Sequence, residues 1–114
     1  MISTHILDTS LGKPAENVLI NLEKKDSTNH QWVQIASGLT NQDGRVSFNS
    51  QPDKGIYRLT FGIEAYFSKN KINNTTDSLF FLDTSVVFQI TDTNRKYHIP
   101  LLLNPYGYTT YRGS

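Results

Sequence analysis

The chain contains no cysteine. Disulfide bridges, thiolate metal sites and a thiol nucleophile are therefore excluded. Long apolar runs are also missing, since no stretch approaches the roughly 20 apolar residues of a membrane-spanning helix. The chain also has no excess of charge of one sign. Its 11 Lys and Arg residues are scattered along the sequence and nearly balanced by 10 Asp and Glu residues, so the net charge is +1. We therefore expect neither a membrane partner nor a nucleic-acid partner.

A chain of 114 residues is long enough to bury one hydrophobic core. Residues 1–114 are therefore predicted to form a single domain. The opening residues, MISTHILDTS, lack the basic start and the apolar stretch of a secretory signal. We expect a cytoplasmic protein, although a periplasmic protein whose leader had been removed would have the same sequence.

Apolar and polar residues alternate along most of the chain, as they do in strands with one buried face. The clearest alternation covers residues 17–25, 44–49, 57–61, 85–91 and 96–103, and weaker candidates cover residues 3–9, 30–37 and 108–113. Clusters of Gly, Pro, Asn and Asp separate these segments. About eight short strands at this spacing predict an all-β fold, a sandwich of two sheets.

One segment breaks the alternation. In residues 63–71, IEAYFSKNK, the apolar side chains Ile63, Tyr66 and Phe67 stand at helical spacing, and the segment has a basic end. A short helix is therefore predicted there. The polar residues 72–78 that follow are predicted to form a loop.

Histidine is the side chain best suited to proton transfer near neutral pH. The chain has three, His5, His30 and His98, and none stands two or four residues from another, so a local metal motif is missing. His30 adjoins a turn and is interpreted as a surface residue. His5 and His98 lie within strand patterns.

His98 alternates with the apolar residues Tyr97 and Ile99, so it is predicted to face away from the core. Pro100 and Leu102 share its face, which makes that face apolar as well. An apolar outward face around a histidine is typical of an interface or a pocket wall. The alternative is a structural histidine at a subunit contact, and spacing alone favours this alternative.

Arg45 directly follows the pair Asp43-Gly44, which is a strong signal for a hairpin turn. The arginine should therefore stand at a fixed position where a strand begins. Its planar guanidinium suits a carboxylate, another anion or a delocalised carbonyl system. Taken alone, however, an ordinary surface arginine is the better interpretation.

The last residues, YGYTTYRGS, carry three tyrosines and an arginine before the chain stops at Ser114. Chain ends are usually frayed and polar, and a frayed end is one interpretation. The other is an end that is docked and used, because a site built on the hydroxyl and carboxylate of Ser114 would require this length of chain.

Three segments together resemble the 5-hydroxyisourate hydrolases, also called transthyretin-like proteins: THILDTSLGKPA (4–15), TNQDGR (40–45) and YHIPLLLNPYGYTTYRGS (97–114). The ending Tyr111-Arg112-Gly113-Ser114 looks like the terminal signature of that family. Residues 55–67, GIYRLTFGIEAYF, are similar to its strand followed by its single short helix. The resemblance implies a transthyretin (prealbumin)-like sandwich of two four-stranded sheets. It also implies a homotetramer, a dimer of dimers with its sites at the dimer–dimer interface.

The same resemblance implies an activity in purine catabolism. Enzymes of this family hydrolyse a cyclic amide of 5-hydroxyisourate, the product of urate oxidase, to 2-oxo-4-hydroxy-4-carboxy-5-ureidoimidazoline. No metal or organic cofactor is expected. The family's functional positions correspond to His5, Arg45, His98 and the ending Tyr111 to Ser114.

The chemistry of these residue types suggests a role for each. His98 would orient or deprotonate the attacking water, and His5 would hold substrate or relay a proton. Arg45 would bind the planar ring and stabilise the developing oxyanion. Tyr111 and Ser114 would line the pocket and position water. Which histidine is the general base stays open.

Two other readings compete with the hydrolase. A small-ligand carrier on the same fold, such as vertebrate transthyretin, would lack catalysis, but transthyretin lacks the YRGS ending and the set of histidines and arginine. An interaction module of a cell-surface protein would usually be a piece of a longer chain, whereas this chain starts at Met1 and ends on its own signature. The sequence therefore favours the hydrolase.

Overall fold

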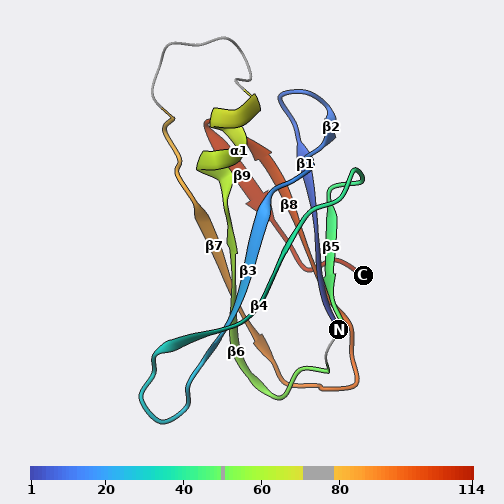
Figure 1. Cartoon of the computed structure of the whole chain (residues 1–114). Helices are drawn as coiled ribbons and strands as arrows, with labels where there is room; N and C mark the ends of the chain where they lie inside the picture. Colours follow the sequence, from blue (N-terminus) through green and yellow to red (C-terminus); the bar gives the residue numbers. More distant parts are fainter. Residues whose placement is uncertain (50, 71–78) are drawn as a thin grey trace.

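The alternating segments form two sheets that pack against each other, with one helix at an end of the sandwich (Figure 1). The computed structural model describes residues 1–49, 51–70 and 79–114. In chain order its elements are β1 (Ile2–Asp8), β2 (Lys13–Pro14), β3 (Leu19–Lys25), β4 (Trp32–Leu39), β5 (Arg45–Phe48), β6 (Gly55–Phe61), α1 (Ile63–Asn70), β7 (Thr84–Ile90), β8 (Tyr97–Asn104) and β9 (Gly107–Thr110). The all-β sandwich with one short helix is thus confirmed. No helix among the described residues has the length and apolarity needed to cross a membrane.

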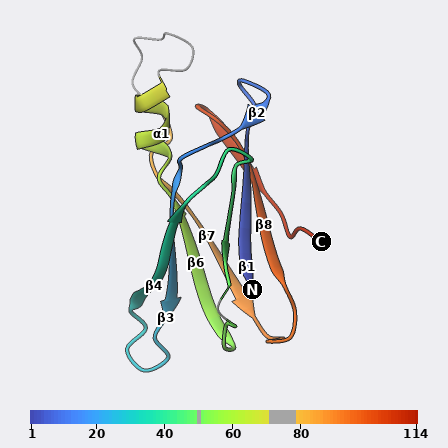
Figure 2. The same cartoon turned by 45° about the vertical axis from the view of Figure 1, so that its right-hand side comes forward.

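The first sheet has the strand order β2-β1-β8-β9, and β5 also pairs with β1. Strands β1 and β8 run parallel, whereas β2, β5 and β9 are antiparallel to their neighbours. The second sheet has the order β4-β3-β6-β7 and is antiparallel throughout. Figure 2 shows the two sheets side by side, with β1 and β8 in one and β3, β4, β6 and β7 in the other.

The core lies between the two sheets. In β1 every second residue is buried, from Ile2 to Asp8, and β6 repeats this pattern with Tyr57, Leu59 and Phe61. This is the arrangement that period-2 alternation predicts, because successive side chains of a strand point to opposite faces. The other face of the first sheet carries the alternate, half-buried residues of β1: Ser3, His5 and Leu7.

Helix α1 is held by its apolar side and by one buried hydrogen bond. Ile63, Tyr66 and Phe67 are buried, and the Tyr66 hydroxyl donates to Asp8 Oδ2 at 2.7 Å. Burial and the neighbouring Asp8 carboxylate both raise the pKa of the Tyr66 phenol. The predicted helix is confirmed over residues 63–70. The predicted loop over residues 72–78 lies outside the described residues.

Two local predictions need correction. The turn at Asp43-Gly44 forms, but it joins β4 of the second sheet to β5 of the first, so it is a corner rather than a hairpin. The strand predicted over residues 108–113 ends at Thr110, and only Gly113 returns to the sheet, as a bridge to His98. The strand predicted over residues 3–9, a weaker candidate, is confirmed as β1, which pairs with β2, β5 and β8.

Candidate functional site

The register of three neighbouring strands places the predicted histidines and arginine on one face of the first sheet. His5 on β1 lies directly opposite Arg45 on β5. Ser3, two residues earlier on β1, lies directly opposite His98 on β8. Residues in register share a face, and so do residues two apart on one strand. His5, Arg45, His98 and Ser3 therefore belong to one surface, which we call the histidine face.

The two imidazoles are close neighbours on the histidine face. Their ring centroids are 6.5 Å apart, with an angle of 29° between the ring planes. Both histidines are half-buried. Nδ1 of His98 is also 2.8 Å from the Ser3 hydroxyl oxygen, so one ring nitrogen is already engaged.

The turn before β5 fixes Arg45 beside His5. Gly44 has a φ of +73°, a conformation that glycine adopts without steric cost. Its carbonyl accepts a hydrogen bond of 2.8 Å from the backbone N–H of Ile6. Arg45, which comes next, is exposed and forms no salt bridge with another described residue. Its positive charge is therefore available to the face.

Burial and the positive charge of Arg45 lower the pKa of both imidazoles, which therefore stay neutral over a wider pH range. Burial lowers the pKa of His5, the Arg45 guanidinium lowers it further, and a hydrogen bond with the backbone of Asp43 and the charge of Asp43 act in the opposite direction. The pKa of His98 is lowered by burial, by Arg45 and by His5. Neutral imidazole can accept a proton, and a guanidinium can stabilise negative charge on a carbonyl oxygen. The face can thus support hydrolysis of a carbonyl compound.

The end of the chain lies against His98. The backbone N–H of Gly113 donates to the carbonyl of His98 at 2.8 Å. A Cβ atom at Gly113 would stand 2.6 Å from Cδ2 of the His98 ring. Only glycine lets the backbone pass this close. Ser114, the next residue, is exposed.

Tyr111 lies on a different side of the same histidine. It is 57% exposed and lines, with His98 and Arg112, a small cleft of about 230 Å³ where β7 and β8 approach each other. The Arg112 guanidinium stands 5.6 Å from the centre of the Tyr97 ring, which also lines the cleft. The structure thus brings His5, Arg45 and His98 together and places Tyr111 and Ser114 at the margins.

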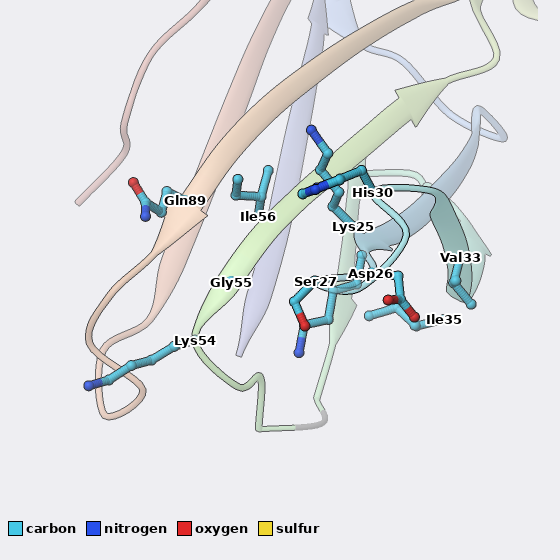
Figure 3. A pocket seen from close by; sticks show the side chains of 11 residues that line it. Lys25, Asp26, Ser27, His30, Val33, Ile35, Lys54, Gly55, Ile56 and Gln89 are labelled. Atoms are coloured by element: carbon cyan, nitrogen blue, oxygen red, sulfur yellow. The ribbon is translucent and has the colours of Figure 1, made fainter.

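A larger cleft lies away from these residues (Figure 3). It has a volume of about 770 Å³ and is lined mainly by the turn between β3 and β4 and by the start of β6, with Lys24, Lys25 and Lys54 among its residues. His30, which is exposed as predicted, stands at this cleft. None of the predicted site residues lines it. Cleft size alone would therefore have pointed away from His5 and His98.

No group of three or more His, Cys, Asp or Glu side chains arranged to hold a metal ion was found among residues 1–49, 51–70 and 79–114. One residue of the histidine face, Ser3, was not singled out from the sequence. The available signal for Ser3 was its place two residues before His5 in an alternating strand. Its contact with His98 depends on the parallel pairing of β1 with β8, which alternation does not reveal.

Comparisons with known proteins agree with this arrangement. A sequence model described as the HIUase/Transthyretin family matches residues 2–113. A protein of Salmonella typhimurium named 5-hydroxyisourate hydrolase is 43% identical, over 100% of this chain and 81% of its own length. A mouse protein of the same name is 38% identical, over 99% of this chain and 94% of its own.

Two solved structures have the same fold. The 5-hydroxyisourate hydrolase of Klebsiella pneumoniae superposes with a TM-score of 0.81 at 32% identity, covering 99% of this chain and 98% of its own. Sea bream transthyretin in complex with thyroxine gives a TM-score of 0.86 at 30% identity, covering 98% of this chain and 93% of its own. The family match and the full-length relatives together show that the chain belongs to the HIUase/Transthyretin family.

Proposed function

We propose that this protein is a hydrolase that opens the cyclic amide of 5-hydroxyisourate to give 2-oxo-4-hydroxy-4-carboxy-5-ureidoimidazoline. The observation that carries the proposal is the meeting of His5, Arg45 and His98 on one face of the first sheet. Two imidazoles with lowered pKa values beside a guanidinium suit a hydrolysis that needs a proton acceptor and an anion stabiliser. The relatives named 5-hydroxyisourate hydrolase support the choice of substrate.

The reaction follows from the chemistry of these groups. A histidine takes a proton from water as the water oxygen attacks the ring carbonyl. Arg45 stabilises the negative charge that develops on the carbonyl oxygen. When the C–N bond breaks, the leaving nitrogen receives a proton from the histidine that was protonated in the first step. One water molecule is added, and no metal or organic cofactor enters.

The end of the chain is the second part of this proposal. The hydrogen bond of Gly113 to His98 holds the chain end beside the histidine. Ser114 would place its hydroxyl and carboxylate where they can position water, and Tyr111 would contact the substrate. A substrate bound between this end and the histidine face would be shielded from bulk water, which strengthens polar contacts.

The functional unit we propose is a homotetramer, a dimer of dimers, in which a neighbouring subunit covers the histidine face. Leu7 and Leu102 lie directly opposite each other on that face and are half-buried. An apolar surface of this kind favours a covering partner. The cytoplasmic location predicted from the sequence stays a prediction.

A carrier of small ligands is the competing function, and sea bream transthyretin supports it through its fold. The TM-score of that structure is 0.86, against 0.81 for the hydrolase of Klebsiella pneumoniae. Folds host many functions, so the site residues must discriminate. A carrier has no need of two neighbouring imidazoles beside an uncompensated guanidinium.

The deciding experiment follows the absorbance of freshly generated 5-hydroxyisourate. The protein should accelerate its decay well beyond the spontaneous rate. His98→Ala and Arg45→Ala should each cost at least about 2–3 kcal/mol of transition-state stabilisation, the size expected for an oriented catalytic group. Lys54→Ala, in the larger cleft, serves as the control and should match the wild type. Decay at the spontaneous rate would favour the carrier.

A further inference from the structure

The Ser3 hydroxyl touches the site but has no part in the reaction described above. Its oxygen lies 2.8 Å from Nδ1 of His98, and the two residues face each other across the parallel pair β1 and β8. Both side chains are half-buried. A contact in register between two paired strands is held by the sheet itself, so the ring of His98 has little freedom to turn.

This contact can decide which nitrogen of His98 carries the proton. A neutral imidazole has one N–H and one lone pair, and the hydrogen bond made at one nitrogen sets the role of the other. If the Ser3 hydroxyl donates to Nδ1, the imidazole proton must be on Nε2. This direction also gives the Ser3 proton an acceptor, and no other side-chain hydrogen bond of Ser3 was found in the described structure.

We propose that Ser3 is a positioning residue: its hydroxyl donates to Nδ1 of His98 and keeps the imidazole proton on Nε2. His98 is then a hydrogen-bond donor, and His5 is the base. This inference rests on the proposed hydrolase and settles which histidine takes the proton from water. Gly113 completes the arrangement, because its bare backbone lies against the Cδ2 side of the same ring.

The surroundings of His5 agree with this division. Burial and Arg45 lower the pKa of His5, but the backbone and the charge of Asp43 raise it and so favour the protonated ring. Asp43 therefore stabilises the imidazolium that His5 becomes when it takes a proton. For His98, in contrast, burial, Arg45 and His5 all lower the pKa, and no neighbouring group in the described part of the chain raises it. An uncharged imidazole whose Nε2 carries the proton can polarise a carbonyl by donating a hydrogen bond to its oxygen.

The proton balance of the reaction is then complete. The lone pair of His5 takes a proton from water while the water oxygen bonds to the carbonyl carbon. The carbonyl oxygen becomes negative and accepts hydrogen bonds from Nε2–H of His98 and from Arg45. The C–N bond breaks, and the His5 imidazolium gives its proton to the leaving nitrogen. Both histidines return to their starting forms.

The test combines two measurements on the full-length protein. The first is the ¹⁵N NMR spectrum of the histidine ring nitrogens, which reports the tautomer of His98 without substrate. The second is steady-state hydrolysis of 5-hydroxyisourate. The variants are Ser3→Ala, which removes the hydroxyl, and Ser3→Thr, which keeps it. Ser47→Ala is the matched control, because Ser47 is the neighbour of Ser3 on the opposite strand β5.

We expect His98 of the wild type to carry its proton on Nε2. Ser3→Ala should mix the two tautomers and lower kcat about tenfold, a typical cost of losing the partner that orients a functional histidine. KM should stay within about twofold, because the hydroxyl does not contact substrate. Ser3→Thr should retain both the tautomer and kcat, and Ser47→Ala should match the wild type.

Two results would overturn the assignment of Ser3: a proton on Nδ1 of His98 in the wild type, or a Ser3→Ala variant with unchanged kcat. A wild type that holds the Nε2–H tautomer but does not hydrolyse 5-hydroxyisourate would overturn the proposed function while supporting the contact between Ser3 and His98. The two proposals can therefore fail separately.

Discussion

At the scale of single residues, the Gly113 backbone lies against the His98 ring and leaves no room for a side chain. A Cβ atom at position 113 would be 2.6 Å from Cδ2 of His98, so Gly113→Ala must displace either the ring or the chain end. We expect kcat/KM to fall at least about tenfold, since even a small displacement of catalytic groups from their working geometry lowers the rate strongly. The thermal midpoint should hardly change, because the chain end is exposed.

Gly107→Ala is the matched control for this prediction. The nearest atom to a Cβ at Gly107 is Oδ1 of Asn104 at 4.0 Å, an ordinary contact. The control should keep full activity. An active Gly113→Ala variant would show that the chain end is not used at the histidine face.

The charge of Arg45 gives a pH prediction. Arg45 lowers the pKa of both His5 and His98. A base must be unprotonated, so activity is lost as the pH falls through the pKa of the catalytic histidine. Arg45→Gln removes the positive charge and lets that pKa rise. The acid limb of the profile of log kcat/KM against pH should therefore move to higher pH, in addition to the loss of rate.

The control for the pH prediction is Arg95→Gln, which removes an exposed arginine of the turn between β7 and β8. Its profile should superimpose on that of the wild type. An acid limb in Arg45→Gln that stays in place or moves to lower pH would contradict the electrostatic account.

Single residues also show which parts of the candidate site could be predicted from the sequence and which could not. Residue chemistry and family resemblance together selected His5, Arg45 and His98, and the register brings these three onto one face. Ser3 was not predicted because its partner, His98, lies 95 residues away in the sequence. Ser114 is a different case: its proposed role depends on substrate and neighbouring subunits, which the fold of one chain does not supply.

At the scale of elements, the corner between β4 and β5 delivers Arg45 to the histidine face. Gly44 occupies this corner with a φ of +73°, and a Cβ there would stand 2.5 Å from the backbone oxygen of Ile6. Backbone atoms in a sheet cannot easily move aside. Gly44→Ala should therefore lower the free energy of unfolding by more than about 2 kcal/mol, combining backbone strain with a steric clash.

Gly12→Ala separates the two contributions in this prediction. Gly12 has a similar φ of +67°, but a Cβ atom added there would have no heavy atom within 4 Å. This variant should lose only about 1 kcal/mol of unfolding free energy, the cost of placing alanine in this backbone conformation. Urea unfolding of both variants measures the difference. Equal losses would mean that the contact with Ile6 is unimportant.

The hydrogen bond between α1 and β1 gives a further prediction. Tyr66→Phe removes the hydroxyl that donates to the buried Asp8 carboxylate at 2.7 Å. Hydrogen bonds to charged groups contribute about 1.5–3 kcal/mol, and we expect a destabilisation of that size in urea unfolding. Tyr106→Phe, at a side chain that is 62% exposed, should cost almost nothing. A Tyr66→Phe variant as stable as the control would show that this hydrogen bond does not help to hold α1 against β1.

Elements were predictable where a local pattern sets them. Alternation located the main strands, and the spacing of Ile63, Tyr66 and Phe67 located α1, because burial of one face is a local property. Strand partners were not predictable in the same way. Nothing in the turn Asp43-Gly44 reveals that its two flanking strands join different sheets, and the two-residue β2 is too short for any periodicity.

At the scale of the whole molecule, the sandwich does not distinguish the hydrolase from the carrier. The TM-scores of 0.81 and 0.86 place both kinds of protein on the same fold. The difference must lie in the few side chains of the histidine face and in what covers them. Whether a neighbouring subunit covers the histidine face therefore bears on function, because a single subunit leaves this face open.

The covering of the histidine face can be tested by placing a charge on it. Leu102 is half-buried on this face, opposite Leu7, and Leu102→Glu would put a carboxylate into the proposed subunit contact. Unpaired charges are strongly disfavoured at a buried interface, so the variant should shift from tetramer to smaller species and lose activity per chain. Leu39→Glu, at a side chain of the second sheet that is 57% exposed, should keep both the mass and the activity of the wild type.

Dilution of the unmodified protein tests the same idea without a substitution. Mass and activity measured together should fall over the same range of concentration, since dissociation exposes the histidine face to water and weakens its polar contacts. Added wild-type protein at high concentration should restore the rate. A monomer with full activity per chain would show that one subunit holds the complete site, and the covering contact would then have no part in catalysis.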